Sequence, residues 1–461
     1  MHSAIKRLRV LDINHSNSLV SRIRAAGLAD NMNFFVYTHR LINKCKYLAR
    51  LTAQPSIRLA YTLWSVACAG ILLFMIVFSP SAEVYDETYH MGLTRLVQST
   101  GLREALCSTQ NQSAAGPLFP MLHCVLSPLT GGLPPYTRFV NFGFMIASIG
   151  AIYLTLAPHA NYAREAAVSL LAVPQLWKAT GMTLTEIPAL FFFSVFMMVF
   201  VRPAPSMTAV SCLLRGLLAG ASLGVAILGR QTYLVAVAPL VMTAIMHRHL
   251  RLQAAATLCT MGFVCGWLFM LWGGLVPPSL QSVDSGLRLR HGLFSFSYLG
   301  VASFLIWPHR YLQASKSLVA SAVALGLAIT LLAGGPNFLP GHGTLLRLLP
   351  APLAHGAAMM CAPLFLGAGS LWVMMLARDL VVSVRSPGTA FILMNTLVLA
   401  LAPVKVSHLF SSRYIVGTLG AECSRNTDFE PSWLHLVALV CGSLAGAMSL
   451  ATHYSLNPGP G

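Results

Sequence analysis

The chain contains few charged residues and very few acids. Only 9% of its 461 residues are charged, and it holds just 13 Asp and Glu residues. An ordinary soluble domain has roughly 25% charged residues, so a soluble globular protein is excluded. The hydrophobic fraction of 56% and the mean hydropathy of +0.68 instead indicate a multi-span helical membrane protein.

The sequence also lacks metal-binding cysteine motifs and a cleavable secretory signal. The ten cysteines form no CxxC motif and no Cys/His spacing typical of a metal site. Cys107 and Cys124 flank one loop, and a disulfide between them would require an oxidising compartment. Residues 1–57 are basic but lack an apolar core followed by a small-residue cleavage site, which excludes a cleavable secretory signal. They are interpreted as a cytoplasmic leader, with an organelle transit peptide as the alternative.

The net charge of +17 does not indicate a nucleic-acid partner, because the basic residues lie in short loops between apolar segments. There they set membrane orientation and contact anionic head groups. The expected organisation is a basic leader (1–57), one membrane domain (58–455) and a short Pro/Gly tail (456–461).

Apolar stretches long enough to approach the roughly 20 residues of a membrane span recur along the chain. They lie near 59–79, 139–157, 166–179, 187–201, 208–228, 233–247, 253–275, 292–307, 317–334, 356–377, 388–404 and 433–452. The predicted fold is therefore all-α, a polytopic transmembrane helical bundle of about 11–13 spans. The segment 414–421 is too short to cross alone and either begins a thirteenth span or is re-entrant.

Lysine and arginine collect in cytoplasmic loops. With the leader placed inside, the basic segments 246–251 and 309–316 also fall inside. Most carboxylates then fall outside, namely Glu83, Asp86, Glu87, Glu104, Glu186, Asp284, Glu422, Asp428 and Glu430. Opposite charges gathered on one face are what a polar reaction site at the membrane edge requires.

The first outer loop, about 80–138, is long for a compact bundle and begins with a concentrated polar motif. Asp86 and His90 would share one face of a helix, with Glu87 beside them. A carboxylate next to an imidazole can hold its tautomer, bind a metal or act as a general base. The structural alternative is an acidic helix N-terminus that favours the macrodipole.

Three further outer segments carry candidate residues. Glu186 follows Thr185 at the start of an apolar helix, where an N-terminal acid is also structurally favourable. Arg230 begins the Arg-Gln-Thr run that continues with Gln231. The late segment contains His408, Arg413 and Tyr414, which are either interfacial anchors or partners for a phosphate.

These motifs resemble the GT-C class of membrane glycosyltransferases, and most closely the dolichyl-phosphate-glucose α-1,2-glucosyltransferases. The protein O-mannosyltransferase and aminoarabinose transferase families are related. The matching runs are Asp86-Glu87-x-x-His90, Arg138-Phe139-Val140-Asn141, Thr185-Glu186, Arg230-Gln231-Thr232 and Arg413-Tyr414. The resemblance is weaker at Ala114–Pro120 and in the lack of a first-loop Trp.

The resemblance implies inverting transfer of a sugar, glucose or another hexose, from a polyprenyl- or dolichyl-phosphate donor to a hydroxyl of a lipid-linked glycan. Asp86 would be the general base, and Glu87 and His90 would orient the acceptor or tune Asp86. Arg230 and Arg413 would hold the donor phosphate. Glu186 would contact sugar hydroxyls. Arg138, Gln231, His408 and Tyr414 complete the expected substrate-binding set, and the need for a divalent metal stays open.

Two other functions fit the same composition. A transporter or flippase for a lipid-linked or anionic solute would also carry charged groups in a helical bundle, and a non-catalytic scaffold would retain the fold alone. The expected location is the endoplasmic reticulum membrane of a eukaryote or the inner membrane of a bacterium, with the active site on the luminal or periplasmic face. Asn111-Gln-Ser113 is a glycosylation sequon whose occupancy would distinguish them.

Overall fold

The computed structural model describes residues 56–202, 208–281, 286–332, 350–384, 386–405, 410–425 and 429–456. The chain separates into two units, Met1–Ala60 and Tyr61–Gly461, and the second contains the bundle. Nearly all of the predicted leader, the tail from 457 onwards and His408 lie outside the described residues. The regular structure of the described part is entirely helical, as the sequence predicts.

The first span is Ser56–Val77. The remaining elements, in chain order, are α3 (Glu87–Thr100), α4 (Leu102–Cys107), α5 (Leu118–Thr130), α6 (Tyr136–Leu156), α7 (Ala163–Val168), η1 (Ser169–Ala172), α8 (Pro174–Gly181), α9 (Glu186–Val201), α10 (Ala209–Gly229), η2 (Gln231–Ala236), α11 (Val237–Met246), η3 (Arg248–Leu250), α12 (Arg251–Trp272), η4 (Pro278–Leu280), α13 (Leu289–Ile306), α14 (Pro308–Leu312), α15 (Lys316–Leu332), α17 (Ala351–Ser383), α18 (Pro387–Leu401), η6 (Ala402–Lys405), η7 (Ser412–Ile415), α19 (Val416–Ser424) and α20 (Trp433–Leu456).

Within the described part, eight helices are long and apolar enough to cross a membrane, or nine if the bent pair α8 and α9 forms one span. The multi-span character is thus confirmed. Helices coincide with the predicted stretches, but the stretch 166–179 is broken into α7, η1 and α8. The predicted range of 11–13 spans counted short segments such as α11 and α15 as complete crossings.

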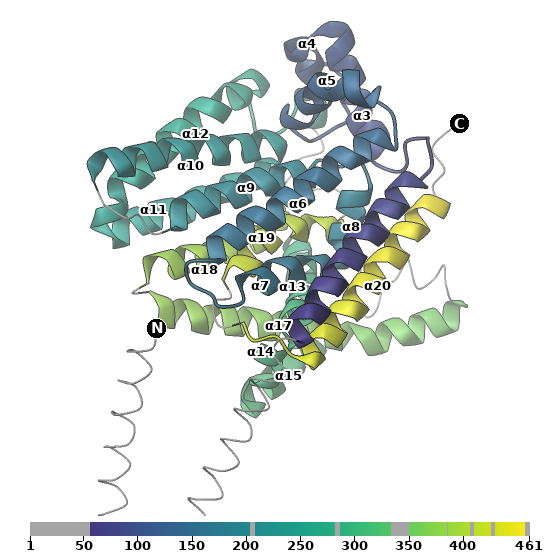
Figure 1. Cartoon of the computed structure of the whole chain (residues 1–461), viewed down its shortest axis with the longest axis vertical. Helices are drawn as coiled ribbons and strands as arrows, with labels where there is room; N and C mark the ends of the chain where they lie inside the picture. The colour runs from purple at the N-terminus through teal and green to yellow at the C-terminus, as the bar shows by residue number, and fades with distance from the viewer. Residues whose placement is uncertain are drawn as a thin grey trace, which may run out of the picture. The chain divides into compact units, whose positions relative to one another are not determined.

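Figure 1 shows α6, α9, α10 and α12 side by side, with α3, α4 and α5 gathered at one end of the bundle. Close contact of α10 with α12 depends on glycines at a spacing of four. A Cβ atom at Gly220 would lie 2.4 Å from the carbonyl oxygen of Thr257. Small residues at such a spacing let membrane helices approach closely.

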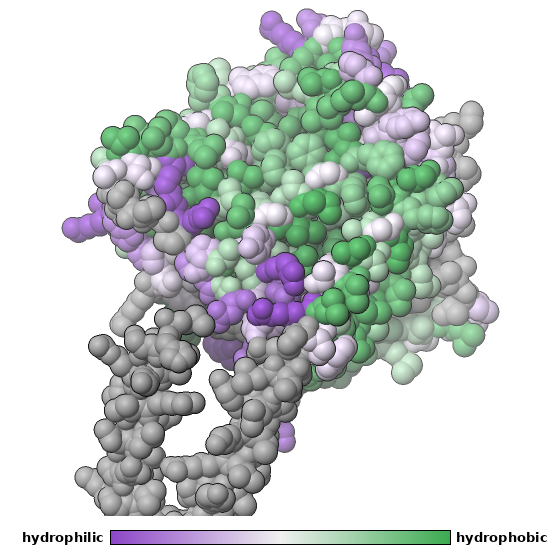
Figure 2. All heavy atoms as spheres, in the orientation of Figure 1, coloured by the Kyte–Doolittle hydropathy of each residue, from purple (hydrophilic) through white to green (hydrophobic). Residues whose placement is uncertain are grey.

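The outer surface of the bundle is apolar. Figure 2 shows hydrophobic residues over most of the visible face, with hydrophilic residues gathered over α3 and α4 and towards the opposite edge. Phe263 and Met270 of α12 are more than 80% exposed. Large apolar side chains exposed in this way are suited to a lipid environment, because hydrocarbon does not penalise them as water does.

The structure corrects the predicted position of one acid. Glu422 was expected on the outer face, but its Oε1 accepts a hydrogen bond from Ser303 at 2.7 Å and pairs with Arg425 at 2.8 Å. Arg425 lies within electrostatic reach of Arg310, in the predicted inner segment 309–316, and of Asp379, which pairs with Arg310. Glu422 therefore belongs to a separate charged cluster towards the inner ends of the helices.

The same correction applies to the segment that follows. Ser432 hydrogen-bonds to the inner-loop residue His309, so the chain has changed sides between Arg413 and Ser432. The stretch between them includes the nine-residue helix α19. This explains why 414–421 was too short to be recognised as a span.

The structure bears on two possibilities raised for the first outer loop. Cys107 and Cys124 are both free thiols, so the considered disulfide is absent from this structure. Asn111 is 1% exposed, and its Oδ1 accepts a hydrogen bond from the backbone N–H of Ser113 at 3.0 Å. A glycan on Asn111 is incompatible with this burial, so the sequon is not a useful marker of compartment.

Candidate active site

A sharp break between α8 and α9 creates the centre of the site. Pro174 opens α8, and Met182 at its end is extended, so α9 begins anew at Glu186 with a bend of 114°. The break leaves backbone carbonyls without helical partners, and such groups are costly inside a membrane protein. Asn141 of α6 compensates, because its Nδ2 donates to the carbonyls of Met182 and Leu184 at 2.8 and 2.9 Å.

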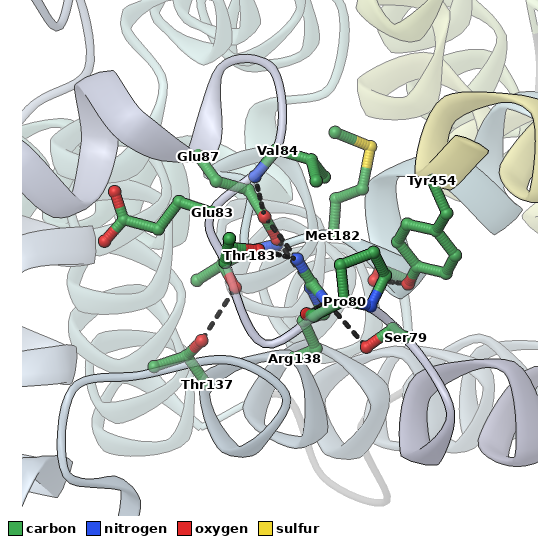
Figure 3. Close-up of polar contacts among 12 residues, drawn as sticks. Ser79, Pro80, Glu83, Val84, Glu87, Thr137, Arg138, Met182, Thr183 and Tyr454 are labelled. Carbon is green, nitrogen blue, oxygen red and sulfur yellow. Dashed lines mark hydrogen bonds and ion pairs between the residues drawn. The ribbon is translucent and has the colours of Figure 1, made fainter. Parts of the chain in front are cut away.

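A buried ion pair between Glu87 and Arg138 holds the other side of the break (Figure 3). Both side chains are fully buried. The Glu87 carboxylate accepts Nε and Nη2 of Arg138 at 2.8 and 2.6 Å, and it accepts the backbone N–H groups of Val84 and Thr183 at 2.7 and 2.5 Å. The pair therefore joins the first loop to α6 and to the break.

Every hydrogen-bonding position of this pair is occupied. A carboxylate has about four lone-pair sites, and Glu87 uses four. A guanidinium has five N–H groups, and Arg138 directs its remaining ones to Ser79 and to the carbonyls of Pro80 and Ala82. This geometry leaves Glu87 and Arg138 no open hydrogen-bonding position for the expected contact with substrate, and it favours a positioning role for both.

Asp86 has a different environment although it is adjacent to Glu87 in sequence. Its Oδ2 pairs with Nη2 of Arg413, and its side chain is 20% exposed. Arg413 also places Nε 3.1 Å from Oε1 of Glu186, and the same oxygen accepts a hydrogen bond from Nη2 of Arg230. The four side chains form a continuous chain of alternating charges, which we call the charge tetrad: Asp86, Arg413, Glu186 and Arg230.

The tetrad is largely buried and electrically balanced. The exposed fractions of the Glu186, Arg413 and Arg230 side chains are 4%, 11% and 15%. Two carboxylates offset two guanidinium groups, so neither sign is left uncompensated in a region of low polarity. Within the described residues, Glu186 Oε2 and Arg413 Nη1 have no hydrogen-bond partner, which leaves an acceptor and a donor for a ligand.

His90 lies beside the tetrad. Its Nδ1 is 2.9 Å from the hydroxyl of Ser113, its ring packs against Phe119, and its side chain is buried. Burial, followed by the positive charges of Arg413 and Arg230, lowers the pKa of His90 well below its usual value of 6.5. His90 is therefore neutral at physiological pH and is suited to hydrogen bonding within the site.

Gln231 and Tyr414, which the sequence also predicted, lie near the tetrad but are not part of it. Gln231 donates from Nε2 to the carbonyl of Ala114 at 2.9 Å, which ties η2 to the first outer loop. Tyr414 places its ring 5.7 Å from the guanidinium carbon of Arg230. His408 lies outside the described residues.

Two contributors to the site were not selected from the sequence. Tyr85 packs its ring 5.9 Å from the guanidinium carbon of Arg413, and Lys178 of α8 lies within electrostatic reach of the same group. Lys178 was recognisable as a cation on the outer face, whereas nothing in the local sequence marked Tyr85. Among the described residues, no group of three or more His, Cys, Asp and Glu is arranged to hold a metal ion.

No family model, curated protein or solved structure matches this chain. We therefore infer the function from the residues themselves and from their geometry.

Proposed function

We propose that the protein is a GT-C-type inverting glycosyltransferase that uses a polyprenyl-phosphate sugar as donor and a hydroxyl of a lipid-linked glycan as acceptor. The proposal is supported by one observation above all: the partly exposed carboxylate of Asp86 lies against Arg413, beside a second guanidinium, Arg230. A base and two phosphate-binding cations are the groups that this reaction needs within one site.

In the proposed reaction, the acceptor hydroxyl attacks the anomeric carbon from the face opposite the phosphate. A C–O bond forms with the acceptor, the C–O bond to the phosphate breaks, and the hydroxyl proton passes to Asp86. The leaving polyprenyl phosphate carries away the bonding electrons. Arg413 and Arg230 stabilise the negative charge that develops on it.

Because Asp86 is paired with Arg413, binding of the donor phosphate would directly change the surroundings of the general base. A donor phosphate competes with Asp86 and Glu186 for the N–H groups of Arg413 and Arg230. Occupation of Arg413 by phosphate would release the Asp86 carboxylate for the acceptor hydroxyl. Glu186, whose Oε2 has no partner among the described residues, is placed to accept hydrogen bonds from sugar hydroxyls.

The test is transfer of a labelled sugar from a polyprenyl-phosphate donor by the purified protein. Asp86→Asn should lower the rate by at least about 100-fold, the usual minimum for loss of a general base, while donor binding survives. Glu83→Gln is the matched control, since Glu83 lies in the same loop but pairs with Arg95 at the surface. Unchanged transfer in Asp86→Asn would refute the role of this residue.

A transporter for a lipid-linked or anionic solute is the second candidate, and the break between α8 and α9 favours it. Transporters build their binding sites at broken helices, and Glu186 begins the second half of this one. Reconstitution into vesicles distinguishes the two functions. Movement of the intact donor across the bilayer without release of its sugar would favour the transporter.

A further inference from the structure

A groove lies between the end of the first span and α20. Its volume is about 500 Å³, within the range of small-molecule sites. The residues that line it are Phe74, Met75, Phe78, Ser79, Pro80, Ala451, Tyr454 and Ser455.

The walls of the groove are apolar and its polar groups are already engaged. Phe74 and Phe78 are 60% and 72% exposed. The Ser79 hydroxyl accepts a hydrogen bond from Arg138 at 2.5 Å, and the Tyr454 hydroxyl donates to the carbonyl of Gly181. The groove thus offers contact area to an apolar chain and little to a polar head group.

The position of the groove indicates where its ligand comes from. The first span and α20 both have the length and hydropathy of membrane spans, and only 28% and 33% of their apolar windows are buried in the protein. Their exposed faces would lie against lipid. A molecule can therefore enter the groove directly from the bilayer.

Tyr85 lies beside both α20 and the charge tetrad. Its ring packs edge-on against His453, the sequence neighbour of the groove residue Tyr454, with 5.8 Å between centroids. The same ring lies 5.9 Å from the guanidinium carbon of Arg413. Figure 3 shows the Tyr454 end of the groove beside the Glu87–Arg138 pair.

The backbone at Tyr85 is strained. Its φ of 55° is the sole positive value at a non-glycine position among the described residues. Such a conformation is unfavourable for a non-glycine residue and is retained where the surroundings demand it, often at functional sites. Here the Tyr85 ring contacts both His453 of α20 and the Arg413 guanidinium.

We propose that this groove binds the isoprenoid chain of a polyprenyl phosphate whose phosphate lies on Arg413, with the chain passing Tyr85, which packs against both α20 and Arg413. This inference rests on the proposed function for the identity of the lipid. It adds the binding site of the isoprenoid chain, which the first span and α20 form.

Photo-crosslinking tests the groove without requiring sugar transfer. The probe is a polyprenyl phosphate carrying a diazirine in its second isoprene unit, added to the purified full chain in detergent or nanodiscs. Crosslinked peptides should include residues 74–80 or 451–455. Ala451→Trp fills the groove and should lower this labelling at least fivefold. Ala445→Trp is the matched control, an exposed alanine on α20 that does not line the groove.

Three results would overturn the inference: labelling elsewhere in the chain, labelling that Ala451→Trp leaves unchanged, and equal competition by an ordinary phospholipid. Transfer kinetics then separate this inference from the proposed function. Ala451→Trp should raise the KM of a long-chain donor at least tenfold and leave that of a ten-carbon donor within twofold. Specific labelling without sugar transfer by the unaltered protein would refute the glycosyltransferase while retaining the groove.

Discussion

Arg413 connects two carboxylates that are distant in sequence, since Nη2 pairs with Asp86 and Nε lies 3.1 Å from Glu186. Asp86 precedes α3 in the first outer loop, Glu186 begins α9, and Arg413 precedes α19. One side chain thus fixes the relative positions of three segments. Any function assigned to this end of the bundle has to account for that arrangement.

Replacement of Arg413 by lysine should impair donor binding. A lysine ammonium is a single compact charge and cannot reproduce ion pairs with two carboxylates in different directions. Arg413→Lys should raise the donor KM at least tenfold, which corresponds to about 1.4 kcal/mol of binding free energy. Arg290→Lys, at an exposed arginine of α13, is the control and should leave the KM unchanged. Equal KM values in both variants would contradict the phosphate-binding role of Arg413.

Loss of the buried pair should reduce stability more than any surface pair does. Arg138→Met leaves the Glu87 carboxylate buried without its cation, which costs about 3–5 kcal/mol. Arg95→Met breaks the pair with Glu83, in which Arg95 is 53% exposed, and should cost no more than about 1 kcal/mol. Thermal unfolding in detergent measures the difference, and similar melting temperatures would disprove the role of Arg138 in positioning the break.

Acid should destabilise the fold through His90. Its pKa in the folded state is lowered by burial and by neighbouring arginines, so the unfolded chain binds more protons than the folded chain below pH 6.5. The contribution of neutral His90 to the free energy of unfolding is fully present above that pH. It falls as the pH decreases towards the folded pKa, by up to about 1.4 kcal/mol per pH unit. Unfolding measured between pH 7.5 and 5 should show a shallower pH dependence in His90→Gln. Identical slopes would argue against a depressed pKa.

Close packing of α20 against η1 should make Gly442 intolerant of a side chain. A Cβ atom there would lie 2.1 Å from the carbonyl oxygen of Ala172, so Gly442→Ala should cost about 1–3 kcal/mol. Gly262 of α12 is the matched control, because a Cβ atom added there would meet nothing within 4 Å. Gly262→Ala should be neutral or slightly stabilising, as alanine favours a helix. Comparable losses in both variants would show that the packing is looser than described.

The sequence determined the class of protein and the positions of most helices, because hydropathy over about 20 residues is a local property that the lipid environment enforces. It also selected Asp86, Glu186, Arg230 and Arg413 as candidates for one site. Their proximity was expected from membrane orientation, and the tertiary structure brings all four into one ion-paired chain.

The tertiary structure alone decided how the adjacent acids differ. Successive residues at the start of a helix project about 100° apart, so Asp86 reaches Arg413 while Glu87 turns inward to Arg138. The tertiary structure also decided the side of Glu422. Orientation rules count only helices long enough to cross the membrane, and α19 has nine residues. Long-range packing set both outcomes, and no local pattern encodes it.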